Sequence, residues 1–279
     1  MLPNELFLGV TMYDILFAVG LVSALVVFRL FSDRLGVPAR LLNFVLATGV
    51  AAMLVGVFSS VLFQAVYNYQ ETGVFRLASD TGMTFYGGFL GGAAAFFAVY
   101  FGVGHFVFRD RQHIKYLLTI FNIGACCIAI AHCIGRLGCL CAGCCHGIHA
   151  DPPLGWYMEF AGDTVLPVQL FESLFLGALF VFLTWRTLHR KRYSFPIYLV
   201  TYGVWRFAIE YLRGDDRGSS LVSCLSPSQL TAIVLIICGA ALYFVERYLR
   251  NVTERDNEAS CPPGFAGHSG GMCAGDGVF

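Results

Sequence analysis

Charged residues are scarce in this sequence. Asp, Glu, Lys and Arg make up 13% of its 279 residues, whereas hydrophobic residues make up 57%. Soluble globular domains contain about 25% charged residues, which they need to cover their surface. The composition therefore excludes an ordinary soluble domain and indicates an integral membrane protein.

The sequence also lacks an excess of either sign of charge, and it lacks a basic segment before its first apolar run. Its 18 Lys and Arg residues balance 18 Asp and Glu residues, so no overall positive field points to nucleic acid as a partner. Without a basic n-region and a small-residue cleavage site, the first apolar run is not typical of a cleaved signal peptide. We expect this run to remain in the protein as a helix.

Seven apolar runs are long enough to cross a bilayer, which takes about 20 residues. They lie near residues 13–30, 42–67, 85–108, 116–135, 168–188, 195–212 and 230–249. We predict an all-α, polytopic membrane protein with about seven transmembrane helices in one domain over residues 1–250. Residues 251–279 are polar and glycine-rich and cannot form a core, so we predict a disordered tail.

Basic residues follow the odd-numbered runs. They are Arg29, Arg34, Arg40, Arg109, Arg111, Lys115, Arg186, Arg190, Lys191, Arg192, Arg247, Arg250 and Arg255. The positive-inside rule then places the N-terminus outside and the C-terminal tail in the cytoplasm. This topology places the cysteine-rich segment around residue 140 on the outer side.

Few charged residues interrupt the apolar runs, and each is a candidate site residue because charge is costly inside a bilayer. Arg206, Glu210 and Arg213 follow i, i+4 and i+7 spacing, so they share one helical face. Arg206 and Glu210 can pair and leave Arg213 facing a phosphate. The alternative is a structural ion pair that only locks two helices together.

His132 precedes Arg136 by one helical turn on the same face. An arginine keeps its charge and binds anions, and a histidine accepts a proton near neutral pH. The pair therefore has the spacing of a base beside an anion clamp, although a histidine in a helix can also serve packing alone.

Two further segments have the pattern of helix starts with a possible ligand. Gly87, Gly88 and Gly91 open the third run, where small residues allow either close helix packing or the approach of an anionic headgroup. Pro167 begins the fifth run and Glu172 follows in its first turns. That glutamate either complements the helix dipole or orients an arginine.

Several cysteines follow Arg136 within a short segment of the sequence. The candidate thiol or redox residues are Cys139, Cys141, Cys144, Cys145 and His146. The residue types allow a zinc or copper site, disulfides on the outer side, or a reactive thiol beside Arg136. Inert packing is the fourth reading, and the sequence leaves all four open.

In order along the chain, these motifs resemble the prolipoprotein diacylglyceryl transferase family. The glycine-rich segment from Gly82 to Gly91 is similar to that family's signature, and Gly135-Arg136-Leu137-Gly138 looks like the start of its signature loop. The segments from Pro167 to Glu172 and from Tyr202 to Arg213 are similar to its later motifs. Each motif alone is weak, but together they cover nearly all seven helices.

The resemblance implies a transferase in the inner membrane of a bacterium. It moves a diacylglyceryl group from phosphatidylglycerol to a lipobox cysteine of a preprolipoprotein, or to another thiol acceptor, and it needs no metal or cofactor. The residues expected to be catalytic are Arg136, Arg206, His132, Tyr86 and Glu210. Those expected to bind substrate are Gly87, Gly88, Gly91, Tyr13, Tyr202, Gln169, Glu172 and Arg213.

The sequence departs from the family pattern at positions that carry hydrogen bonds. Tyr86 stands where the family has a histidine, and Cys139, Ala142 and Cys144 replace two asparagines and a glutamate. We therefore expect His132 or His146 to supply the base. The alternatives are a membrane thiol oxidoreductase using Cys141 with Cys144, or a metal- or lipid-binding protein using the Cys139–His146 cluster.

Overall fold

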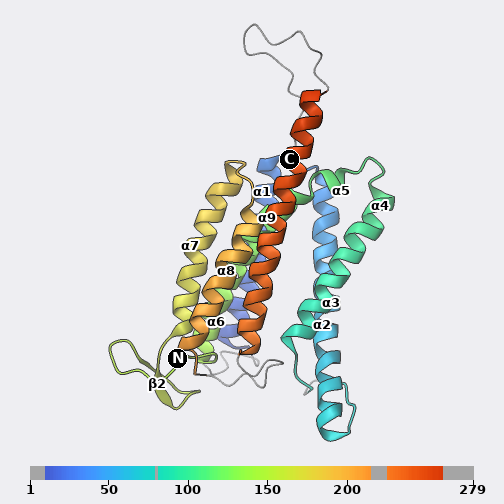
Figure 1. Cartoon of the computed structure of the whole chain (residues 1–279). Coiled ribbons are helices and arrows are strands. Elements are labelled where there is room, and N and C mark those ends of the chain that lie inside the picture. The colour runs from blue at the N-terminus through green and yellow to red at the C-terminus, as the bar shows by residue number, and fades with distance from the viewer. Residues whose placement is uncertain (1–9, 79–80, 215–224, 260–279) are drawn as a thin grey trace. The chain divides into compact units, whose positions relative to one another are not determined.

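The computed structural model describes residues 10–78, 81–214 and 225–259, and these form two compact units. Unit 1 comprises the described residues of 10–31 and 119–259, and unit 2 comprises those of 32–118. Figure 1 labels the α-helices of both units. The expected single domain over residues 1–250 stays a prediction.

Unit 1 contains five long helices and one small hairpin (Figure 1). The elements are most of α1 (Met12–Leu35), most of α6 (Leu117–Ala142), β1 (Trp156–Met158), β2 (Asp163–Val165), α7 (Val168–Leu188), α8 (Ser194–Ile209), the 3₁₀ turn η2 (Glu210–Leu212) and α9 (Pro227–Ala259). The strands are antiparallel, with Trp156 opposite Val165. Small residues let the helices approach closely: a Cβ at Gly20 of α1 would lie 3.0 Å from the Ala131 carbonyl of α6.

Unit 2 is built on the pairing of two long helices. Its elements are α2 (Ala39–Thr72), α3 (Phe85–Phe97), the π-helical segment η1 (Ala98–Val103), α4 (Gly104–Val107) and α5 (Gln112–Lys115). Gly73 ends α2 in the left-handed conformation, with φ of 73°, and donates a hydrogen bond to the Tyr69 carbonyl. Such an ending needs a residue without a Cβ, which explains glycine at this position.

Within the part of the chain that the structure describes, six helices are long and apolar enough to cross a membrane. They span Met12–Leu35, Ala39–Gln70, Tyr86–Val107, Leu117–Ala142, Val168–Leu188 and Pro227–Tyr248. The seventh expected run is α8, whose 16 residues fall short of the usual length and continue into η2. The chain is therefore a polytopic, all-α membrane protein, as its composition predicts.

Two helices extend beyond their predicted ends. α6 continues to Ala142 instead of ending near residue 135, because the chain has no strong helix breaker before Gly143, where φ is +74°. α9 continues to Ala259, past the expected start of the tail at residue 251. Residues 251–259 include glutamate and arginine, which favour helix, and extending an existing helix is easy. Residues 260–279 of the expected tail lie outside the described residues.

Candidate functional site

A fully buried carboxylate, that of Glu172 on α7, joins three helices of unit 1. Its Oε2 lies 2.9 Å from Nε of Arg136 on α6. Its Oε1 accepts a hydrogen bond of 3.0 Å from the hydroxyl of Tyr202 on α8. A buried charge requires such partners, so these contacts explain how Glu172 is accommodated inside the unit.

His132 borders the same carboxylate. Its Nε2 lies 3.8 Å from Oε1 of Glu172, and its ring packs edge-on against Tyr202 with 5.1 Å between the ring centroids. His132 and Arg136 thus approach one acidic group from adjacent turns of α6, in agreement with their i, i+4 spacing. The structure gives Glu172 the orienting contact with an arginine that was one of its two predicted roles.

The outer end of the Arg136 guanidinium makes no hydrogen bond to any described residue. Only Nε is engaged, through the ion pair with Glu172. The Arg136 side chain is 12% exposed, and its fully buried nitrogen is Nε. The two Nη groups are therefore available to a ligand that reaches this part of unit 1.

Arg206 and Glu210 form a second charged cluster, at the end of α8. Nη1 of Arg206 lies 2.8 Å from Oε2 of Glu210, so the predicted pair is present. Nη2 of Arg206 donates to the hydroxyl of Ser228, and the hydroxyl of Ser226 donates to Oε1 of Glu210. These bonds fasten α8 to the start of α9. Sequence reasoning missed both serines, although they flank the Pro227 helix start.

Arg213 lies in a strip of paired backbone that the sequence did not predict. Gly147 forms an antiparallel bridge with Arg213, and the Ile148 amide donates to the Leu212 carbonyl at 3.0 Å. On its other side, the Gly147 amide donates to the Leu166 carbonyl at 2.9 Å. The chain after the cysteines therefore runs between η2 and the β2 strand, which fixes Arg213 beside the cysteine segment.

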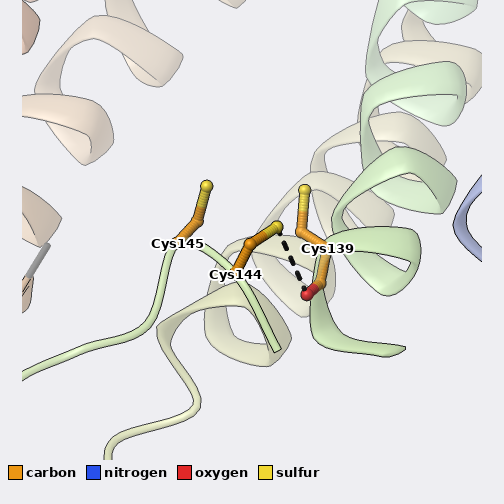
Figure 2. A group of neighbouring side chains, drawn as sticks. All are labelled: Cys139, Cys144 and Cys145. Atoms are coloured by element: carbon orange, nitrogen blue, oxygen red, sulfur yellow. Dashed lines mark hydrogen bonds between the residues drawn. The ribbon is translucent and has the colours of Figure 1, made fainter. Parts of the chain in front are cut away.

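Three of the candidate cysteines gather at the end of α6. Cys139 lies in the last turn of the helix, and the left-handed Gly143 turns the chain so that Cys144 and Cys145 return towards it (Figure 2). The three sulfurs all lie within 4.8 Å of one another. Cys141 is absent from this group although it belongs to the C-x-x-C spacing, because it follows Cys139 on the helix and faces another way.

Gln169 of α7 holds this turn in place. Its Nε2 donates a hydrogen bond of 2.6 Å to the backbone carbonyl of Cys144, and the Cys144 thiol donates to the Cys139 carbonyl at 3.8 Å. His146 also lies outside the three-sulfur group, with its Nδ1 3.0 Å from the Gly147 carbonyl. Gln169 thus acts on the backbone of the cysteine turn.

The three thiols have unequal electrostatic surroundings. Hydrogen bonding with the Cys139 and Cys144 side chains lowers the pKa of Cys145, and the neighbouring Arg213 guanidinium lowers it further. The three cysteines are free and half-buried. Tyr13 of α1 lies within electrostatic range of all three, and its ring packs against Gly138.

The glycine-rich segment belongs to unit 2, where its glycines pack α3 against α2. A Cβ at Gly87 would lie 2.6 Å from Cβ of Phe63, and one at Gly91 would lie 2.3 Å from the Ser59 hydroxyl. Gly88 similarly approaches Ser60. Close helix packing accounts for these glycines, and their contact with substrate stays a prediction.

Tyr86 is the second residue of α3 and is 42% exposed. Near it, the Thr84 hydroxyl donates to Oε1 of Gln64, whose Nε2 donates to Oδ1 of Asn68. Sequence reasoning did not identify these two amides. Their signal was the i, i+4 spacing of polar side chains inside the apolar run of α2.

Comparison with known proteins places these features in one family. The family described as prolipoprotein diacylglyceryl transferase matches residues 4–245. The phosphatidylglycerol–prolipoprotein diacylglyceryl transferase 2 of Clostridium perfringens is 28% identical over 253 residues, which cover 88% of this chain and 94% of the relative.

Two further relatives are named phosphatidylglycerol–prolipoprotein diacylglyceryl transferase. That of Clostridium tetani is 31% identical over 174 residues, covering 60% of this chain and 65% of the relative. That of Dehalococcoides mccartyi is 27% identical over 253 residues, covering 86% and 90%. The similarity therefore extends over nearly the whole described chain.

Proposed function

We propose a function from one premise: this chain belongs to the prolipoprotein diacylglyceryl transferase family. It transfers a diacylglyceryl group from phosphatidylglycerol to a cysteine thiol of a prolipoprotein, the reaction for which its relatives are named. The acceptor is a lipobox cysteine. We place the enzyme in the bacterial inner membrane as a multi-pass protein with its N-terminus outside.

The reaction exchanges one bond for another at a glycerol carbon. The acceptor sulfur forms a bond to this carbon, and the bond from the carbon to the phosphate oxygen breaks. The bonding electrons leave with that oxygen, which gives glycerol phosphate, and the thiol proton passes to a base. The site must therefore hold a phosphate that gains negative charge and place a base near the sulfur.

The contacts of Arg136 are the main support for this proposal. Glu172 engages its Nε, so the guanidinium is oriented while both Nη groups are left for the phosphate. Two parallel N–H donors match two phosphate oxygens, and their hydrogen bonds strengthen as the leaving group gains negative charge. Arg206, held by Glu210 and Ser228, supplies a second positive charge in the same unit.

We assign the remaining residues of unit 1 to positioning. Tyr202 fixes the Glu172 carboxylate, and Gln169 fixes the turn that bears Cys144. Glu210 orients Arg206, and Arg213 lies beside the same turn. Tyr13 contributes its hydroxyl to the headgroup.

His132 is our candidate base. Its imidazole lies one turn from Arg136, and its Nε2 is near Oε1 of Glu172, a carboxylate that stabilises the ring after it accepts a proton. His146 is less suitable, because its Nδ1 already lies against the neighbouring Gly147 carbonyl. His132→Ala should remove the rise of kcat/KM with pH that a neutral base produces, whereas a packing role would leave that profile in place.

The direct test is mass spectrometry of a lipobox peptide incubated with purified protein and phosphatidylglycerol. We expect a diacylglyceryl mass gain, with initial rates reduced about 100- to 1,000-fold in Arg136→Ala. Arg186→Ala is the matched control, since it removes an arginine of α7 that binds the Arg192 carbonyl and stacks near Phe182. Transfer that survives in Arg136→Ala would disprove the clamp assignment, and no transfer by the wild type would disprove the function.

A further inference from the structure

The transfer reaction leaves the three-sulfur group at the end of α6 without a role. We propose that Cys139, Cys144 and Cys145 bind one soft metal ion, monovalent copper, through three thiolates. The sulfurs lie within 4.8 Å of one another, and all three cysteines are free. This site goes beyond the proposed transferase function, which requires no metal.

The geometry is close to that of a bound ion. Metal–sulfur bonds of about 2.3 Å place three sulfurs around one centre about 4 Å apart. The three sulfurs, all within 4.8 Å of one another, are therefore no more than about 1 Å further apart than this arrangement requires (Figure 2). Cys145 has a φ of +61°, a conformation that residues other than glycine seldom adopt, and this turn brings the third sulfur to the group.

The donor set selects the metal. Thiolates are soft ligands that favour monovalent copper or zinc over magnesium, calcium or manganese. Structural zinc sites almost always have four ligands, and neither Cys141 nor His146 belongs to the three-sulfur group. Three thiolates suit monovalent copper, which accepts trigonal coordination.

Nearby positive charge suits the complex. Three thiolates and one monovalent ion carry a net charge of −2, and the Arg213 guanidinium hydrogen-bonds Cys145. Arg136 lies within electrostatic range of Cys139 and Cys145. On binding, each cysteine that is still protonated loses its S–H proton to solvent and three copper–sulfur bonds form, with no electron transferred.

The site has a structural consequence for the chain. A metal shared by Cys139 and the two following cysteines ties the last turn of α6 to the segment that pairs with Arg213. Gln169 already holds the same turn from α7. The metal would therefore fix the segment that leads from the end of α6, the helix that carries Arg136, to Gly147, whose backbone pairs with Arg213.

The test is a titration of the full chain with monovalent copper, under anaerobic reducing conditions, against a chromogenic copper(I) chelator. Free thiols are counted beforehand. We expect one copper per chain to withstand the chelator, and affinity to fall at least tenfold in Cys139→Ser, Cys144→Ser and Cys145→Ser. Cys141→Ser is the matched control and should retain the copper, although it removes a neighbouring thiol of the same helix turn.

X-ray absorption of the wild-type complex provides a measurement that does not depend on variant folding. Three sulfur neighbours support the site, whereas two sulfurs, or any nitrogen or oxygen ligand, would overturn the three-thiolate assignment. Equal losses in Cys141→Ser and Cys139→Ser would also overturn it. No copper held by the reduced wild type would reject the site altogether, while leaving the transfer assay unaffected.

Discussion

The helices of the two units are joined by different kinds of side chain. Among the described residues, unit 1 buries the charged side chains Glu172, Arg206, Arg213 and Glu246. Unit 2 buries Ser32, Thr48, Ser60, Thr81 and His113, and its charged residues lie towards the helix ends and connections. Its main helix pair is instead joined through glycines, since α3 presents Gly87, Gly88 and Gly91 to α2.

This difference distinguishes helices that are joined through buried charged side chains from helices that are joined through close packing of small residues. Small residues join apolar helices through close packing and cost little inside a bilayer. Buried charges are costly there and persist where they serve a site. The contrast therefore favours unit 1 as the place of the proposed phosphate clamp, whereas close packing accounts for the pairing of α2 with α3.

The largest effect should follow from removing the central acid of unit 1. Glu172→Ala leaves Arg136 as a buried charge without its partner, which costs about 3–5 kcal/mol of unfolding free energy. Thermal or denaturant unfolding in detergent measures this loss. The double variant Glu172→Ala/Arg136→Ala should be less destabilised than the two single effects sum to. Simple additivity would mean that the two residues do not stabilise each other.

The corresponding change in unit 2 is Gly91→Ala. Its new Cβ would lie 2.3 Å from the Ser59 hydroxyl and 2.4 Å from Ser59 Cβ, so the helices must separate, at a cost of about 1–3 kcal/mol. Gly102→Ala is the control, because a Cβ there meets nothing within 4 Å. The same unfolding assay compares the two. Equal stability of the two variants would contradict close packing as the reason for Gly91.

A smaller effect should come from Gln169→Leu, which keeps the side-chain bulk but removes the donor to the Cys144 carbonyl. An unpaired buried carbonyl costs about 1–3 kcal/mol. The freed turn should also expose Cys144 and Cys145 to faster alkylation, measured by mass spectrometry. Gln112→Leu in unit 2 controls for the change of residue type. Unchanged alkylation in Gln169→Leu would show that other contacts hold the turn.

The smallest effect concerns the exposed hairpin of unit 1. The His149 Nδ1 hydrogen bond lowers the pKa of Asp163, and the Thr164 amide contributes further. A depressed folded pKa stabilises the protein above the unfolded pKa of about 3.9, and this contribution disappears as pH falls through the folded pKa. His149→Ala should therefore lower the melting temperature near neutral pH and converge with the wild type in strong acid. A constant difference at all pH values would exclude this linkage.

Local patterns along the chain were sufficient to predict part of the candidate site. The i, i+4 spacing predicted that His132 and Arg136 share a face, and it predicted the pair of Arg206 with Glu210. Helical periodicity is a local property, so these relations follow from sequence order alone. The same reasoning missed the hairpin, because strands of three residues are too short to show an alternating pattern.

Contacts between distant segments were beyond this reasoning. Arg136 and Glu172 are far apart in the chain and on different helices, and only helix packing brings their charged groups to 2.9 Å. Cysteine spacing favoured Cys141 with Cys144, whereas the fold assembles Cys139 with Cys144 and Cys145. The reason is the positive φ of Gly143, which reverses the chain after the helix and selects which sulfurs meet.

The sequence by itself determined that this protein lies in a membrane and where its main helices run, because composition and helical periodicity are local properties. It also determined which family the protein resembles, through motifs in order along the chain. Only the tertiary structure decided which partner each buried charge has and which thiols form a group. Such partners come from separate helices, and their pairing depends on how apolar surfaces pack rather than on spacing along the chain.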